Sequence, residues 1–80
     1  MPVFLDVHTM PSIDNEKVQE LIGSKDEFDV TPINILFNRE ADLCYCLQEA
    51  PNKEAVEKHH SKFNLKCEWI MEVTLAKKMN

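Results

Sequence analysis

Four short stretches of the chain alternate apolar and polar residues with a period of two, and this pattern predicts β-strands. The predicted strands span Pro2–Thr9, Thr31–Asn38, Leu43–Gln48 and Cys67–Leu75. The polar turn Asn38–Ala41 is short enough to join the second and third strands as a hairpin. Pro51 ends the third strand, because proline cannot donate a hydrogen bond to a strand ladder.

Between the first two strands, apolar residues recur at three- and four-residue spacing, which is typical of an amphipathic helix. This helix is predicted from Ile13 to about Ile22, with Ser12 as its N-cap and Gly23 at its end. Its expected buried positions are Val18, Leu21 and Ile22.

A second helix is predicted after the third strand. Asn52 is a good N-cap, and Asn64 suits the left-handed backbone that ends many helices. The buried stripe of this helix consists of Ala55, Val56, His59, His60 and Phe63.

The element order β-α-β-β-α-β predicts an α+β protein with the ferredoxin-like arrangement, built as one domain over residues 1–80. Right-handed crossovers place the first strand between the third and the fourth, antiparallel to both. Two helices cover only one face of the four-stranded antiparallel sheet, so the other face needs cover of its own. We therefore expect a homodimer in which two sheets face each other as a dimeric α+β barrel.

The overall charge limits the classes of partner. A net charge of −5, with nine scattered Lys and Arg residues, argues against a nucleic-acid partner and suits a metal cation better. No apolar run approaches transmembrane length, and the N-terminus lacks a basic region followed by an apolar one. We expect a cytoplasmic protein with no membrane partner, whose three cysteines are reduced thiols.

The first and third strands carry the candidate chemistry. The period of two projects Asp6 and His8 to one face of the first strand, and Cys44 and Cys46 to one face of the third. Antiparallel pairing of these strands brings the four side chains to neighbouring positions. His8, oriented by Asp6, is a candidate metal ligand, and the alternative is a histidine that lines the barrel and bonds to the partner subunit.

The other thiols and imidazoles have alternative roles. Cys46 is either a thiolate ligand or a small buried hydrophobe. Cys44 and Cys67 are assigned to the core, because C-x-C lacks the C-x-x-C spacing of structural zinc sites. His59 and His60 diverge by about 100° around the helix axis, so we do not expect both to bind one ion, and we favour His60.

The side on which the helices pack decides whether these residues meet. If Val3, Leu5 and Val7 face the helices, then Asp6, His8 and Cys46 point away from His60. On this assumption the simplest arrangement is one metal site on the barrel face and a separate one near the second helix.

Three segments of the chain are similar to a family of small nickel-binding, ferredoxin-like proteins. They are Met1-Pro2-Val3-Phe4-Leu5-Asp6-Val7-His8, then Tyr45-Cys46-Leu47-Gln48-Glu49-Ala50-Pro51, and then His60 with the closing Glu72-Val73. The resemblance implies a dimer that binds a divalent transition metal, with nickel as the favoured ion. Carried over position by position, it implies five site residues: Asp6, His8, Cys46, Glu49 and His60.

The chain departs from the family pattern in two helices. No histidine lies in Val18–Gly23, where relatives often have one, and Phe63-Asn64 replaces a histidine-glycine pair. His59 and Cys44 are extra donors beside the matched residues, available to compensate for these losses.

We expect a metal-binding protein that acts by sequestration or metal response, because mixed imidazole, thiolate and carboxylate donors suit borderline metals. An alternative is a dimeric α+β-barrel enzyme or small-molecule-binding module without metal, in which His8 with Asp6 acts as a base. A further alternative is a metal-free dimeric interaction module with buried thiols.

Overall fold

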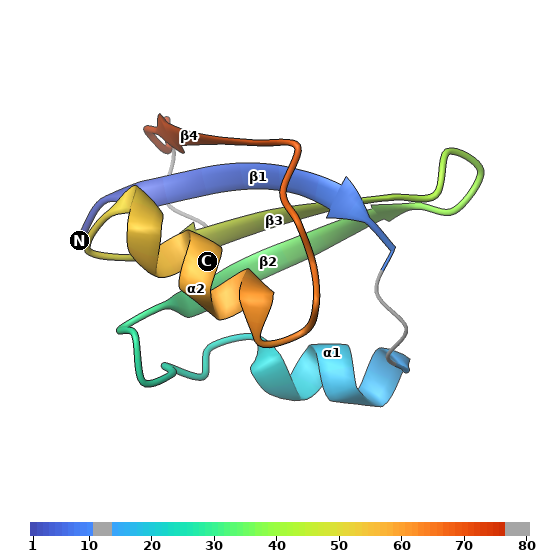
Figure 1. Cartoon of the computed structure of the whole chain (residues 1–80), viewed down its shortest axis with the longest axis horizontal. Helices are drawn as coiled ribbons and strands as arrows, with labels where there is room; N and C mark the ends of the chain where they lie inside the picture. The colour runs from blue at the N-terminus through green and yellow to red at the C-terminus, as the bar shows by residue number, and fades with distance from the viewer. Residues whose placement is uncertain (11–13, 77–80) are drawn as a thin grey trace.

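The computed structural model of the chain describes residues 1–10 and 14–76. Its elements are β1 (Val3–Thr9), α1 (Asn15–Leu21), β2 (Thr31–Asn38), β3 (Leu43–Glu49), α2 (Lys53–Ser61) and β4 (Trp69–Val73). The strands form one sheet in the order β2-β3-β1-β4, and every neighbouring pair is antiparallel. The ferredoxin-like order and the central position of β1 are therefore confirmed. Both helices lie on one side of the sheet (Figure 1).

Local capping explains where the helices begin and end. α1 begins at Asn15, because the side chain of Asp14 accepts a hydrogen bond from the amide of Lys17. Its start thus lies later than predicted, and the expected cap Ser12 lies outside the described residues. α2 begins after Asn52, whose side chain accepts from the amide of Ala55. The predicted left-handed residue at its end is confirmed, with φ of 57° at Asn64.

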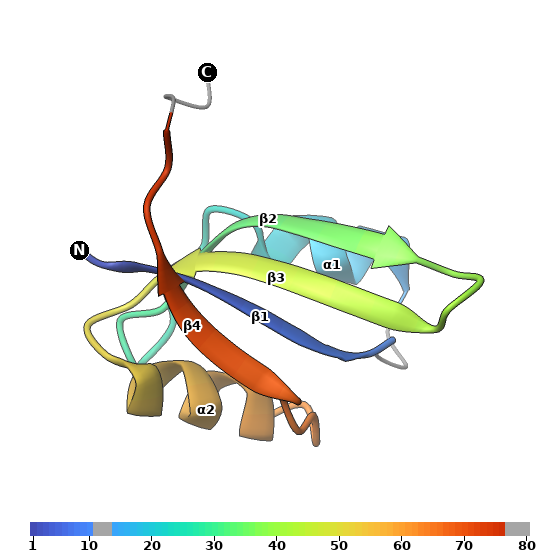
Figure 2. The same cartoon turned by 90° about the horizontal axis from the view of Figure 1, so that it is seen from above.

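The apolar core occupies only part of the space between sheet and helices. It consists of Phe4, Val30, Ala50, Ala55, Val56 and Ile70, with Phe28 and Cys67 packed against it. α1 lies behind β2 and β3, and α2 lies beside β4 (Figure 2). The remaining interior, toward the C-terminal end of α2, is filled by buried polar side chains and thiols.

The helices cover the opposite face of β1 from the one assumed above. Phe4 packs with Val56 of α2 in the core, and Asp6 lies close to His60 of the same helix. Val3, Leu5 and Val7 therefore lie on the open face. The expectation of two separate metal sites is wrong, because Asp6, His8 and Cys46 point toward α2.

The open face of the sheet is largely apolar. The strand register aligns Leu36, Tyr45, Val7 and Trp69 in one row across all four strands. Leu36 is 51 % exposed, Trp69 39 % and Met71 49 %, so large apolar side chains lie open to solvent on this face. No helix in the described ranges is both long enough and apolar enough to cross a membrane.

Candidate metal centre

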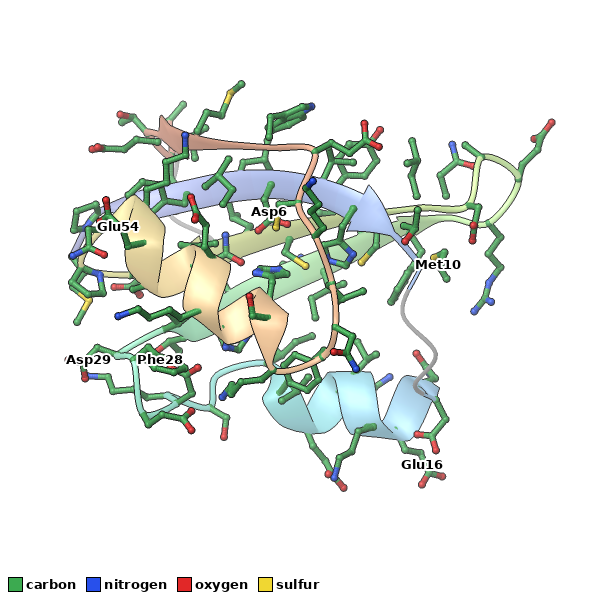
Figure 3. All side chains as sticks on the ribbon, in the orientation of Figure 1. Asp6, Met10, Glu16, Phe28, Asp29 and Glu54 are labelled. Atoms are coloured by element: carbon green, nitrogen blue, oxygen red, sulfur yellow. The ribbon has the colours of Figure 1, made fainter. Side chains whose placement is uncertain are left out.

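Four ionisable side chains meet in the interior between the sheet and α2. They are Asp6 and His8 of β1, Cys46 of β3 and His60 of α2, and one ligand-type atom from each lies within 4.8 Å of the others. All four residues are buried. Figure 3 shows Asp6 below β1, on the side of the helices, whereas Glu16 and Glu54 point outward.

Strand pairing brings three of these residues together. β1 and β3 are antiparallel with Asp6 opposite Cys46 and His8 opposite Cys44. Directly opposed residues project to the same face of a sheet, so the two strands present their polar side chains to one space. His60 then reaches this space from α2, where it lies on the same buried stripe as Val56. The predicted meeting of the first and third strands is confirmed.

Backbone carbonyls set the orientation of both imidazole rings. Nδ1 of His8 lies 2.6 Å from the carbonyl oxygen of Thr9, and Nδ1 of His60 lies 2.9 Å from that of Val56. A carbonyl oxygen only accepts, so each Nδ1 carries the proton and donates it. In the neutral rings, each Nε2 therefore presents a lone pair.

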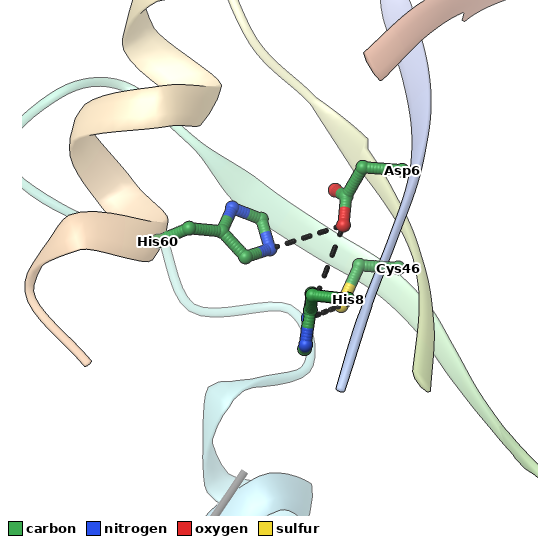
Figure 4. Close-up of side chains that lie close together, drawn as sticks. All are labelled: Asp6, His8, Cys46 and His60. Atoms are coloured by element: carbon green, nitrogen blue, oxygen red, sulfur yellow. Dashed lines mark hydrogen bonds and ion pairs between the residues drawn. The ribbon is translucent and has the colours of Figure 1, made fainter. Parts of the chain in front are cut away.

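Both Nε2 atoms point toward the carboxylate of Asp6, and that of His8 also points toward the thiol of Cys46 (Figure 4). Nε2 of His60 lies 3.3 Å from Oδ1 of Asp6, and Nε2 of His8 lies 3.9 Å from the same oxygen. Nε2 of His8 also lies 3.3 Å from Sγ of Cys46. Four potential donor atoms thus surround one point.

Asp6 has one satisfied and one unsatisfied oxygen. Gln48 donates its side-chain amide to Oδ2 at 2.9 Å and to the carbonyl oxygen of Phe4 at 2.9 Å. Among the described side chains, Oδ1 of Asp6 is a fully buried polar atom with no hydrogen-bond partner. Burying such an atom is unfavourable unless a cation or a proton compensates it.

Burial shifts the protonation of the carboxyl and of one imidazole in opposite directions. Burial raises the pKa of Asp6 from 3.8 to about 6, although the Gln48 hydrogen bond and His8 oppose the shift. Burial also lowers the pKa of His60 from 6.5 to about 4, so its ring is neutral near pH 7. A neutral imidazole can donate its nitrogen lone pair to a metal ion, and the carboxylate oxygen beside it can bind the same ion.

His8, Cys44 and Cys46 shift one another's pKa values. Burial alone would lower the pKa of His8, but hydrogen bonding to Cys44 and to the Thr9 carbonyl outweighs it, and the pKa is raised above 6.5. Sγ of Cys44 lies 4.0 Å from Sγ of Cys46. The contact between the sulfurs lowers the pKa of Cys44 to about 6 and, with burial, raises that of Cys46.

These donors fit a divalent transition-metal ion. Two imidazole nitrogens, a carboxylate oxygen and a thiol sulfur form a mixed set that suits borderline metals such as nickel and zinc. The unpartnered Oδ1 and the two Nε2 lone pairs that face it are an electrostatically unfavourable arrangement, which a cation among them would relieve. Hydrogen bonds already fix the other nitrogen of each ring, as metal-ligating histidines require.

The structure brings together four of the five predicted site residues. Glu49 lies apart, exposed at the end of β3 and paired with Val3 and Thr31. His59 also lies apart, because its Nδ1 contacts Oδ2 of Asp26 at 2.6 Å. The divergence expected for the two adjacent histidines is thus observed.

Of two further residues at the site, Gln48 was missed from the sequence, whereas Cys44 was predicted beside Cys46 and as an extra donor. Gln48, which orients Asp6, was not singled out, although it alternates with Cys44 and Cys46 on the same strand face. Cys44 was assigned to the core. It is buried as expected, and it lies next to Cys46. The period of two contained the signal for both residues.

Two hollows border the centre. A cavity of about 40 Å³ touches His8, Cys44 and Cys46, with Val18 of α1 and His60 of α2 on its other sides. A groove of about 380 Å³ runs between α2 and β4, and His60 lies in its wall. His60 therefore separates the interior from a groove large enough to admit a hydrated ion.

The comparisons with known proteins give one match. Residues 4–73 match the family model described as nickel responsive protein SCO4226-like. This range contains all four residues of the cluster and ends at the last residue of β4. Neither the curated proteins nor the solved structures give a match.

Proposed function

Since the chain belongs to the SCO4226-like family of nickel-responsive proteins, we propose that it binds one divalent transition-metal ion per chain, nickel first, at Asp6, His8, Cys46 and His60. The ion is held or sensed and is not used for catalysis. We place this activity in the cytoplasm and in a homodimer.

The observation that carries the proposal is the arrangement around Oδ1 of Asp6. This buried oxygen has no hydrogen-bond partner in the described chain, yet Nε2 of His60 lies 3.3 Å away. Both ring Nδ1 atoms are committed to backbone carbonyls. The side chains are therefore oriented toward a common point before any ion arrives, which reduces the ordering cost of binding.

Each residue has a distinct part in holding the ion. The two imidazoles supply neutral nitrogen donors, and Asp6 and Cys46 supply negative charge, which favours a divalent ion over water or an apolar ligand. Gln48 holds the carboxylate in place through Oδ2 and leaves Oδ1 free. Binding displaces protons from the ligands, so affinity depends on pH.

The test is nickel titration calorimetry on untagged protein, because an affinity tag would bind nickel itself. We expect near-stoichiometric binding by the wild type, and a loss of affinity of at least about 100-fold in both His8→Ala and His60→Ala, since each removes a ligand. Zinc and copper should compete strongly. Absence of nickel binding by the wild type, or unchanged binding in both variants, would refute the proposal.

His59→Gln is the matched control. His59 is buried, adjacent in sequence to His60 and of the same residue type, but its ring bonds to Asp26. We expect this variant to keep nickel binding within a few-fold of the wild type. Its thermal midpoint should be measured beside the titration, because loss of the Asp26 contact is expected to lower stability.

A further inference from the structure

The four residues of the proposed metal centre are buried, so an ion needs a route to them. Cys46 is the most exposed of the four, and only 8 % of its surface is accessible. A divalent ion moves through water with a shell of roughly six water molecules. The route must therefore begin in a space that accepts the ion together with this shell.

The two hollows beside the centre differ in size and in lining. A water molecule needs roughly 10–15 Å³ of such space, so a hydrated ion needs about 60–90 Å³. The cavity of about 40 Å³ is too small, and Val18, Leu21 and Phe63 make part of its wall apolar. The groove between α2 and β4 holds about 380 Å³ and admits the hydrated ion.

Three residues of the groove wall are neighbours of Asp6. Ile70 is opposite Asp6 in the pairing of β4 with β1, so both side chains project to the same face of the sheet. Nε2 of His60 lies 3.3 Å from Oδ1 of Asp6. Burial, together with the nearby charge of Asp6, raises the pKa of Cys67 to about 12. The unpartnered oxygen of Asp6 therefore lies directly behind this wall.

We propose that the groove between α2 and β4 is the route by which a divalent ion enters and leaves the centre, with His60 as its gate and Glu57 as the residue that attracts the cation. This inference deepens the proposed function and rests on it.

His60 has the position of a gate. Of the four proposed ligands, it alone lines the groove. Its side chain extends from α2 toward Asp6, between the helix and the other ligands (Figure 4). One hydrogen bond, from Nδ1 to the carbonyl oxygen of Val56, holds the ring on the helix side. An ion in the groove therefore meets His60 before Asp6, and this ring must move to let the ion pass.

The charges at the inner end of the groove favour a cation. The groove wall as a whole carries charged side chains of both signs, which are Lys53, Glu57, Lys66 and Glu68. Besides burial, the charges of Asp6 and Glu57 both act on Cys67 and raise its pKa, so both carboxylates lie near this thiol. Two negative charges around one point attract a divalent ion and repel anions.

The first experiment fills the groove and measures how fast nickel exchanges. Ser61→Trp places a large ring in the groove wall at an exposed position of α2. Uptake is followed by stopped-flow absorbance of the nickel–thiolate bond, and release by adding excess chelator. We expect both rates to fall by at least about tenfold, because the path is narrowed, while the equilibrium affinity stays within a few-fold of the wild type.

Lys58→Trp is the matched control for the filled groove. Lys58 is also exposed on α2, but it does not line the groove. This variant should exchange nickel at the rate of the wild type. Equal slowing in both variants, or a wild-type rate in Ser61→Trp, would overturn the proposed route.

The second experiment tests the attraction of the cation. Glu57→Gln should slow nickel uptake by about threefold at low ionic strength, and added salt should abolish the difference. Glu54→Gln removes the same charge from the same helix outside the groove wall, and it should slow uptake by less than about twofold. Equal effects of the two substitutions would contradict the role assigned to Glu57.

Equilibrium titration of the wild type separates this inference from the proposed function. If the wild type does not bind nickel, the proposed function fails and the route fails with it. If the wild type binds nickel but Ser61→Trp exchanges it as fast, the proposed function stands and only the route is wrong.

Discussion

The carboxyl group of Asp6 lowers the stability of the metal-free protein at neutral pH. Its pKa is about 6 in the fold and 3.8 as an ordinary aspartate. The folded state therefore holds the proton more tightly than the unfolded state, and stability falls as pH rises from about 4 to about 6. Above pH 6 the full penalty of up to about 3 kcal/mol is present. A bound cation would offset it.

We predict that Asp6→Asn stabilises the metal-free protein and weakens nickel binding. At pH 7.5 the free energy of unfolding should rise by about 1–3 kcal/mol, because the buried charge is gone while the amide oxygen still accepts from Gln48. At pH 4 the gain should be small, since the wild-type carboxyl is then mostly protonated. Urea denaturation at both pH values measures the difference.

Glu40→Gln is the control for this prediction. It removes the same charge from an exposed turn, so it should not change the free energy of unfolding in a pH-dependent way. Equal gains for Asp6→Asn at the two pH values, or destabilisation at pH 7.5, would contradict the role assigned to Asp6.

Nickel affinity should fall over the whole range from pH 8 to pH 5, because the Cys46 thiol, whose pKa is raised, must lose its proton to bind the ion. The fall should become steeper toward the acid end of the range. Protons compete for Asp6, whose pKa is about 6, and for His8, whose pKa is raised above 6.5, while His60 stays neutral down to about pH 4. Each ligand that must lose a proton weakens binding by about tenfold per pH unit. Calorimetric titrations between pH 5 and 8 check this. An affinity that does not change over this range would show that these side chains do not bind the ion.

The site residues could be predicted individually but not as one cluster. The period of two placed Asp6 with His8 and Cys44 with Cys46, and strand order then joined the two pairs. The period does not say which face the helices cover. β1 carries apolar residues on both faces, with Phe4 on one and Leu5 on the other, so the hydrophobic pattern alone left the choice open.

At the scale of elements, an acidic loop residue attaches the end of α2 to the rest of the fold. Oδ1 of Asp26 accepts from the amides of Phe28 and Val30, and Oδ2 contacts His59 at 2.6 Å and Nζ of Lys62 at 3.0 Å. Burial alone would raise the pKa of Asp26, but these bonds outweigh it and lower the pKa to about 2. The stability that the charge contributes is present above about pH 4 and is lost as pH falls toward 2.

Asp26→Ala should destabilise the protein by about 2–4 kcal/mol, because it leaves His59 and two backbone amides without their acceptor. As for His59→Gln, nickel binding should stay within a few-fold of the wild type, because the contacts of Asp26 go to Phe28, Val30, His59 and Lys62. Denaturation and nickel titration measure the two properties. Glu27→Ala is the control, because Glu27 is exposed and bonds only to Lys62 among the described contacts. It should leave both properties nearly unchanged, and a similar loss of stability in both variants would contradict the assigned role.

Most boundaries of the helices and strands could be predicted from the local sequence, and the exceptions have identifiable physical reasons. Strand β2 and the start of α2 lie where predicted, because proline, asparagine and the alternation are strong local signals. β4 is shorter than predicted and covers Trp69–Val73. It is an edge strand that pairs with β1 alone, so alternation beyond that pairing has no partner strand. α1 begins at Asn15 because Asp14 is the cap.

At the scale of the whole molecule, the open sheet face is the expected interface of the proposed homodimer. A Leu36→Glu, Trp69→Glu double variant should shift the protein to the monomer in sedimentation experiments. Dimer formation would then have to bury charged side chains in an apolar interface. All four proposed ligands belong to one chain, so the monomer should still bind one nickel ion.

Ile22→Glu is the control for the double variant. Ile22 is also exposed, at 38 %, but it lies at the end of α1, in the helix layer. It should change neither association nor nickel binding. Loss of nickel binding by a folded monomer would contradict an intrachain centre, and an unchanged sedimentation coefficient would exclude this face as the interface.

The polar interior has a consequence for how long each molecule survives. Among the largest fully buried side chains are His8, Gln48, Asp6 and Cys44, positions that most small proteins fill with hydrocarbon. A ligand at 100 times its dissociation constant adds about 2.7 kcal/mol to the stability of the folded state. Chains that hold an ion would therefore unfold less often and escape proteolysis longer than chains without one. The amount of this protein in a cell would then follow the supply of its metal, even with no change in its rate of synthesis.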